Sequence, residues 1–384
     1  MPGIFPRLRA EFPILENSTY LISNSLGAMP RGAEQGLQRY ADEWRTRGVR
    51  AWHEGWWEQP TEVGDLVAPI LGVRAGSVSM HHNVTVAAAL FLSCFDYPRE
   101  RNRIVYTEHN FHTLRYLLEG ERRKGAEIRV VPSRDGIGID LDDLLAAIDE
   151  RTRLVPISHV LFRSAFVQDA ERIAARCREV GATLLLDVYQ SAGILPVELD
   201  RWGVDAAVGG CLKWLCGGPG NAFLYVRPGL DAELEPSLTG WQSDEDPFAF
   251  RGAPHRRVPD GAQRFLTGTP NVPAHYAARA GLELLGSIDM LELREYSLTL
   301  TQRIIDAASD AGFEIHSPLD PKHRGGTVTV AHENAEELSR GLLERDILCD
   351  YRPGAGIRLS PHVYSTAEEC DRAIAALTTL RDLL

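Results

Sequence analysis

Short apolar runs alternate with amphipathic segments through the middle of the chain. The runs are rich in Val, Ile and Leu, and their length is typical of buried strands. They lie at 104–106, 128–131, 154–158, 183–186 and 204–208. The segments at 140–149 and 168–180 have the spacing of amphipathic helices. Strands that alternate with helices predict βαβ units, and therefore an α/β fold with a mostly parallel sheet covered on both faces.

The pattern changes on either side of this region. Residues 31–50 have helical spacing, and the stretch 229–268 is rich in Pro, Gly and charge, so we expect a long loop there. The last part alternates helical and strand patterns, which predicts a small α+β domain. We therefore expect an N-terminal segment over 1–50 that joins the small domain, a large domain over 51–255, and the small domain over 256–384.

Composition and charge narrow the class of protein. The 384 residues suffice for a large and a smaller domain. A net charge of −12 argues against nucleic acid or an anionic membrane as the main partner. No apolar stretch has the length of a membrane span, and the first residues carry prolines and charges where a signal peptide has its apolar core. Six scattered cysteines without a CxxC pair favour the cytoplasm and indicate no metal site.

One acid and one lysine follow two of the predicted strands. Asp187 ends the run that begins at Thr183, and Lys213 follows the next run among apolar neighbours. Loss of solvation lowers the pKa of a lysine in such surroundings, so its amine can act as a nucleophile. Pyridoxal 5′-phosphate (PLP) needs this pair, because the lysine forms the Schiff base and the carboxylate keeps the pyridine nitrogen protonated. On spacing alone, a strand-end acid and a surface lysine remain the alternative.

A short polar turn precedes the Ala-rich helical run that begins near residue 87. Asn83 and Thr85 make this turn a natural helix N-cap, whose free N–H groups and dipole suit a phosphate. A cap without a ligand is the simpler alternative. The segment 107–113, Asp187 and Lys213 all come just after predicted strands, and ligands of parallel sheets bind at the carboxyl ends of strands. We therefore expect these groups to share one site.

The chain resembles kynureninase, a fold-type I PLP enzyme of the class V aminotransferase superfamily, over almost its whole length. The resemblance implies a large domain with a mostly parallel, seven-stranded type of sheet and a small α+β C-terminal domain. The motifs that carry it are Tyr20 to Gly27, Gly55-Trp56, Asn83 to Thr85, Glu108 to Phe111, Asp187 to Gly193, Lys213 to Gly220, Gly240-Trp241, Arg264 to Thr269 and Cys349 to Arg358.

The resemblance assigns cofactor contacts position by position. It implies that Lys213 forms the internal aldimine and that Asp187 pairs with the pyridinium. Val84 and Thr85 would bind the phosphate, and Phe111 would stack on the ring. The resemblance also implies cofactor contacts for three further residues, Gln190, Trp241 and Thr269.

The resemblance also implies contacts beyond the cofactor. Trp241 and Thr269 would reach the phosphate in a neighbouring subunit, which implies a homodimer with active sites at the interface. Asn24 and Ser25 would bind substrate, and Arg358 would hold its α-carboxylate, since a planar guanidinium suits a two-oxygen anion.

Two positions depart from the family pattern. Gln190 stands where the family has His, and Leu212 stands where it usually has the Tyr that contacts phosphate and transfers protons. A proton-transfer residue contributes about two to four orders of magnitude in rate. Tyr189, His109 and His159 are therefore candidates to replace that tyrosine.

These motifs predict a PLP-dependent enzyme that acts on an amino acid by kynureninase-like hydrolysis of a Cβ–Cγ bond. The departures leave open a C–S lyase or cysteine desulfurase, an aminotransferase or epimerase, and a protein that binds PLP without chemistry. A desulfurase needs a reactive thiol near Arg358. Cys349 is near in sequence, but the apolar residues before it favour a buried, inert thiol.

Overall fold

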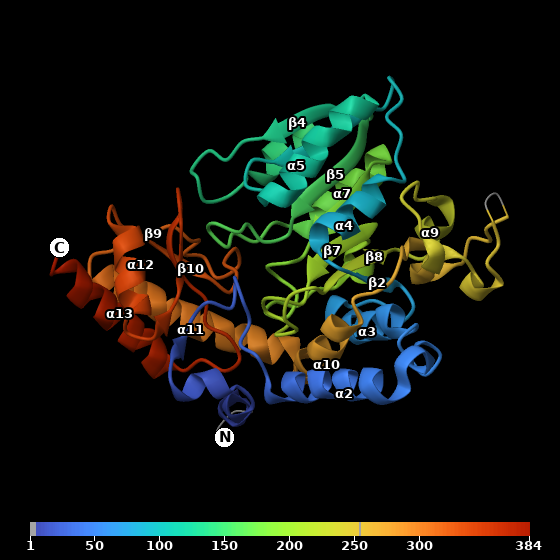
Figure 1. The fold of residues 1–384 in the computed structure, drawn as a ribbon. Coiled ribbons are helices and arrows are strands. Elements are labelled where there is room, and N and C mark those ends of the chain that lie inside the picture. Colours follow the sequence, from blue (N-terminus) through green and yellow to red (C-terminus); the bar gives the residue numbers. More distant parts are fainter. Residues whose placement is uncertain (1–4, 253–254) are drawn as a thin grey trace.

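The computed structural model describes residues 5–252 and 255–384, and its largest sheet has seven strands (Figure 1). β8 is antiparallel to both of its neighbours, β2 and β7, and the other strand pairs are parallel. This arrangement confirms the predicted α/β fold. Across the sheet, the strands are β2 (Val78–His81), β8 (Ala222–Val226), β7 (Ala206–Gly210), β6 (Thr183–Asp187), β5 (Thr152–Ser158), β3 (Arg103–Thr107) and β4 (Glu127–Val131).

Helices cover both faces of this sheet, and alternate residues of each strand pack into two separate cores. Leu184 and Leu186 of β6 belong to one core, whereas Leu185 between them belongs to the other. This explains why the strands have continuous apolar runs rather than an alternating pattern. The helices of this part are α4 (Val84–Leu92), α5 (His112–Glu121), α6 (Leu141–Ala147), α7 (Ala170–Val180) and α8 (Leu199–Trp202).

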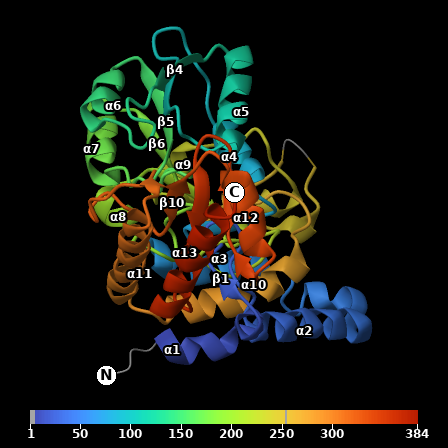
Figure 2. The ribbon, with the colours of Figure 1, turned by 90° about the vertical axis from the view of Figure 1, so that its left-hand side faces the viewer.

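A second, four-stranded antiparallel sheet lies to one side, in the orange and red part of the chain (Figures 1 and 2). Its strands, in order across the sheet, are β12 (Asp350–Arg352), β13 (Gly356–Leu359), β10 (Val328–Ala331) and β9 (Glu314–Ile315). The helices packed with it are α11 (Met290–Asp310), α12 (Ala335–Leu343) and α13 (Ala367–Arg381). Their apolar faces form a third core, as expected for a small α+β domain.

The N-terminal segment contacts both parts. β1 (Thr19–Tyr20) pairs in parallel with β11 (Ile347–Leu348), and it follows the short helix α1 (Phe5–Leu8). α2 (Arg31–Arg47) instead packs along α10 (Val272–Gly286), below the large sheet in Figure 1. The domain limits at residues 50 and 255 stay a prediction.

The remaining segments are mostly short turns. α3 (Gln59–Val67) packs on β2, and α9 (Leu230–Glu233) begins the stretch that was expected to be a long loop. The described residues of this stretch also form short 3₁₀ turns, at 241–243, 247–249 and 261–265. Among the described helices, none is both long enough and apolar enough to cross a membrane.

Candidate functional site

A cavity of about 250 Å³ opens at the carboxyl ends of the central strands. The register of the sheet places the ends of β5 and β6 side by side, with Ser158 opposite Asp187, and Asp187 opposite Val208 of β7. Asp187 therefore ends its strand at the floor of this cavity. Six residues predicted for the site line the cavity together: Val84, Thr85, Phe111, Asp187, Gln190 and Lys213.

Lys213 lies in the turn that follows β7, and its amine is enclosed by aromatic rings. Its Nζ lies 4.5 Å from the centroid of the Tyr189 ring and 5.6 Å from that of Phe111. Burial lowers the pKa of Lys213, and the positive charge of Arg358 lowers it further, although Asp187 opposes both effects. A larger fraction of this amine is therefore neutral and nucleophilic than for a lysine in water.

Asp187 is the buried acid of the pair. Its Oδ1 accepts a hydrogen bond of 3.0 Å from the backbone N–H of Tyr189, which fixes the carboxyl at the end of β6. Burial raises the pKa of Asp187, and the charge of Lys213 acts in the opposite direction. A carboxylate here is costly unless a cation lies against it, and a protonated ring nitrogen is such a cation.

The N-terminus of α4 offers donors to an anion. The Asn83 Oδ1 accepts the N–H of Val86 at 3.0 Å, so this residue caps the helix as predicted. The N–H groups of Val84 and Thr85 have no acceptor among the described residues. Together with the helix dipole, these donors suit a phosphate. The site thus has a group for each of four parts of PLP. The amine suits its aldehyde, the carboxylate its ring nitrogen, the aromatic rings its ring face, and the helix terminus its phosphate.

Gln190 lines the cavity, but both ends of its amide are engaged. Its Nε2 donates to the carbonyl of Asn24 at 3.0 Å, and its Oε1 accepts from the indole N–H of Trp214 at 3.0 Å. The side-chain amide of Asn24 is buried without a partner among the described residues. The Ser25 hydroxyl accepts from Arg352 at 3.4 Å. Asn24 therefore lies behind Gln190, and neither Asn24 nor Ser25 lines the cavity. Their role in binding substrate stays a prediction.

Arg358 is buried and already paired. Two of its nitrogens contact Asp350 at 2.7 and 2.6 Å, and a third donates to the carbonyl of Phe162 at 2.6 Å. Asp350 also contacts Arg352 at 3.0 Å. Arg358 thus lies against Phe162, a wall of the cavity, with one edge of its guanidinium held by a carboxylate. Its role in binding the substrate carboxylate stays a prediction.

Two predicted residues lie away from the cavity within the chain. Trp241 packs against Trp57 and Phe250, and its indole N–H donates to the carbonyl of Pro247 at 2.6 Å. Thr269 is exposed. Neither of them lines the Lys213 cavity. The prediction that they serve a neighbouring subunit stays a prediction.

The three candidates to replace the family's tyrosine differ in whether they line the cavity. Tyr189 lines the cavity, whereas His109 and His159 do not. His159 packs edge-on against Trp202, and burial lowers its pKa to about 4. Burial also lowers the pKa of His109, and Arg163 adds to the effect. Leu212 lines the cavity and brings no polar group to it.

The fold and this site define a PLP-dependent enzyme of fold type I. Residues 19–372 match the family model described as aminotransferase class-V, and the chain belongs to that family. The cofactor is PLP, as the sequence predicted.

Two curated relatives match nearly the full length. The chain is 32% identical to the uncharacterized aminotransferase YcbU of Bacillus subtilis, with 95% of each chain covered. It is 31% identical to the kynureninase of Burkholderia pseudomallei, with 98% of this chain and 92% of the relative covered. The kynureninase-like resemblance is therefore confirmed.

Solved structures with the same fold are more distant in sequence. An apo cysteine desulfurase from Thermococcus onnurineus superposes with a TM-score of 0.87 at 20% identity, covering 98% of both chains. The cystine C–S lyase C-DES, solved with cysteine persulfide, has a TM-score of 0.86 at 22% identity and covers 96% of this chain and 99% of its own. These structures show the fold, and they leave the reaction open among class V enzymes.

Proposed function

We propose that this PLP-dependent enzyme acts on a small amino acid and hydrolyses its Cβ–Cγ bond as kynureninases do. The observation that carries the proposal is the buried pair of Lys213 and Asp187 beside the open N-terminus of α4. The similarity to kynureninases over nearly the whole chain supports the choice of reaction.

Bound PLP supplies an electron-withdrawing ring that stabilises negative charge next to it. The protein contributes the groups that hold this ring and move protons. The Val84 and Thr85 N–H groups bind the phosphate, and Asp187 keeps a proton at the ring nitrogen. Lys213 would hold the cofactor, and its free amine would accept and donate a proton at Nζ, which its lowered pKa favours near neutral pH. Water adds across the Cβ–Cγ bond, leaving alanine and a carboxylic acid.

A specific observation favours other class V reactions as the second candidate. Leu212 brings no proton donor to the cavity, and the amide of Gln190 is held by Asn24 and Trp214. A C–S lyase, an aminotransferase or an epimerase would fit the same cofactor groups. A desulfurase with a thiol nucleophile fits less well. Cys349 lies in the core of the small domain, and burial raises its pKa to about 12, so it stays an unreactive thiol.

We also propose a cytoplasmic homodimer, in which Trp241 and Thr269 complete the partner's site. Exposed aromatic surface supports this, since Phe250 is 73% exposed beside Trp241. Light scattering measures the mass of the purified protein and so tests whether it is a dimer. If the sites are shared, mixing inactive Lys213→Ala chains with Trp241→Ala chains restores part of the activity. A monomer, or a mixture without recovery, contradicts the shared site.

The reaction is tested by release of the aromatic acid from L-kynurenine and from 3-hydroxykynurenine. The PLP-loaded protein is compared with Lys213→Ala, in which both the visible absorbance of the lysine-bound cofactor and turnover are expected to vanish. Robust turnover that depends on Lys213 supports hydrolysis. Absence of turnover with an intact visible band contradicts it, and cystine, transamination and racemisation assays then separate the other class V reactions. Absence of any band with added PLP contradicts the cofactor assignment.

A further inference from the structure

Tyr189, so far a candidate only for the missing proton-transfer tyrosine, faces the amine that the cofactor would occupy. It follows Asp187 by two residues, and its backbone N–H donates to the Asp187 carboxylate at 3.0 Å. The same hydrogen bond that fixes the acid thus fixes the backbone of Tyr189. The ring is mostly buried, and its face lies 4.5 Å from Lys213 Nζ.

Phe111 turns a second aromatic face to the same nitrogen, at 5.6 Å. The two rings come from different elements, because Phe111 precedes α5 and Tyr189 follows β6. Both rings also line the cavity. Lys213 Nζ therefore lies within reach of two π faces, and a flat, electron-poor ring attached at this nitrogen can contact both.

Gly210 makes the room for Tyr189. It ends β7, and an ideal Cβ at this position would lie 2.5 Å from both Cζ and Oη of Tyr189. Any side chain at residue 210 would force the tyrosine ring to move. The position of the ring therefore depends on a glycine in the neighbouring strand, three residues before Lys213.

We propose that Tyr189 is a second aromatic wall of the cofactor slot, with Phe111 as the first, and that Gly210 is required for its position. The proposal rests on the proposed PLP function and adds a residue to the binding site. The hydroxyl group of Tyr189 is compatible with this position beside the cofactor. Burial raises its pKa, as do Cys211 and Asp187, so the side chain stays neutral at physiological pH and adds no charge beside Lys213.

The dissociation constant for PLP tests the wall, measured by absorbance titration of the apo protein. Tyr189→Phe keeps the ring and is expected to change the constant less than about twofold. Tyr189→Leu keeps apolar volume without a π face and is expected to weaken binding about threefold to tenfold. Gly210→Ala is expected to act in the same direction. Tyr116→Leu, a matched change at an exposed ring of α5, is expected to have no effect.

A double variant separates the wall from general damage to the fold. Leucine lacks the Cζ and Oη atoms that a Cβ at residue 210 would meet, so Gly210→Ala should add little to Tyr189→Leu. Additive losses would contradict the steric link. Unchanged PLP affinity in Tyr189→Leu, or equal losses in Tyr189→Phe and Tyr189→Leu, would overturn the aromatic wall. These results leave the proposed function standing, since that function is tested on the wild-type protein, by its visible band with PLP and by its turnover of L-kynurenine.

Discussion

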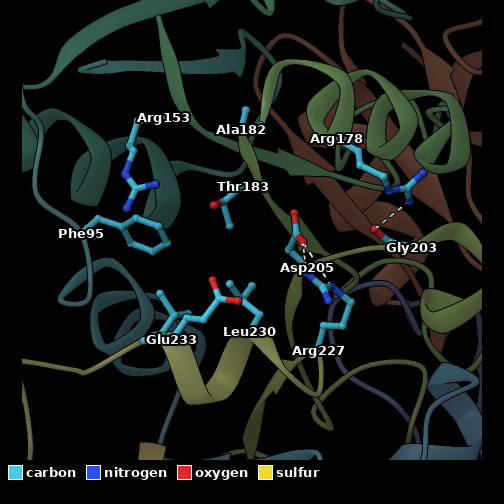
Figure 3. Close-up of a pocket in the computed structure, with 12 residues that line it drawn as sticks. Phe95, Arg153, Arg178, Ala182, Thr183, Gly203, Asp205, Arg227, Leu230 and Glu233 are labelled. Atoms are coloured by element: carbon cyan, nitrogen blue, oxygen red, sulfur yellow. Dashed lines mark hydrogen bonds and ion pairs between the residues drawn. The ribbon is translucent and has the colours of Figure 1, made fainter. Parts of the chain in front are cut away.

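The two ends of the central strands carry two cavities of different character. β6 begins at Thr183, which lines a cavity of about 520 Å³ at the amino edge of the sheet, shown in Figure 3. It ends at Asp187, in the cavity of about 250 Å³ that holds Lys213. The larger cavity holds more charged residues, whereas the smaller one holds the buried pair.

Charges at the amino edge are paired or lie near solvent. Arg227 contacts Asp205 at 3.1 Å, with about two fifths of its side chain exposed. Arg178 is exposed and lies 3.5 Å from the carbonyl of Gly203. Arg153 lies 4.9 Å from the centre of the Phe95 ring (Figure 3). The exposed Arg178 and Arg227 keep much of their hydration and contribute little free energy. Burial lowers the pKa of Arg153, which is only partly exposed.

The carboxyl edge is different because its charges are buried. Burial shifts the pKa of Lys213 down and that of Asp187 up, so each favours its neutral form unless an opposite charge is near. Buried groups with such shifts are typical of sites that perform chemistry. A reactive site is therefore marked by a few charges that are buried together, rather than by the size of a cavity or its number of charges.

The largest effect is expected from a comparison of two ion pairs, one near each of the two cavities. The pair of Asp350 and Arg358 is almost fully buried, whereas that of Asp205 and Arg227 is partly exposed. Asp350→Asn leaves a buried guanidinium without its counter-charge and should lower the free energy of unfolding by about 3–5 kcal/mol. Asp205→Asn should lower it by about 1 kcal/mol or less. Urea denaturation measures both, and equal losses would contradict the contrast.

A second test removes the buried carboxylate itself. Asp187→Asn should lower kcat/KM about 10²–10³-fold on the substrate that the enzyme turns over, because a preorganised charge is lost. It should also lower the pKa of the free Lys213 amine further, since Asp187 and Asp350 are the negative charges that raise it. The rate at which added PLP forms the visible band with the apo protein, measured against pH, reports the second effect, because only the neutral amine attacks the aldehyde. Asp205→Asn is the matched control at the far edge, and an equal loss there would show that the buried position of Asp187 is not what makes it important.

The sequence was sufficient for much of this site. Asp187 and Lys213 could be found because both follow strands of a parallel sheet, whose carboxyl ends meet at one edge. The helix N-terminus that follows Asn83 could be found because its cap is recognisable in the sequence.

Other contacts depend on strand register, which apolar runs do not reveal. Asp350 lies opposite Arg358 because β12 and β13 pair antiparallel in that register. The room that Gly210 leaves for Tyr189 depends on packing between the turns after β6 and β7. Arg358 could be recognised in the sequence, but the carboxylate that holds it could not.

A third test uses a buried histidine at the carboxyl edge. Burial holds the pKa of His159 at about 4 in the folded protein, against about 6.5 when unfolded. Its contribution to stability is therefore present above pH 6.5 and is lost as the pH falls toward 4, by about 1.4 kcal/mol per pH unit. His159→Gln should reduce the slope of unfolding free energy between pH 6.5 and 5 by that amount. An unchanged slope would show that His159 is hydrated and not buried.

The smallest effect is expected at the amino edge. Arg153→Gln removes a cation from the face of Phe95 and should lower the free energy of unfolding by only about 0.5–1 kcal/mol. It should leave PLP affinity and kcat/KM unchanged, because the side chain lies at the opposite end of β5 from Ser158 and the Lys213 cavity. PLP titration and steady-state kinetics of Arg153→Gln and Asp187→Asn, run side by side, compare the amino and carboxyl edges of the sheet under the same conditions. A tenfold fall in kcat/KM without loss of stability would mean that the amino edge acts on the reactive site through the sheet, and the two cavities would then form one functional unit.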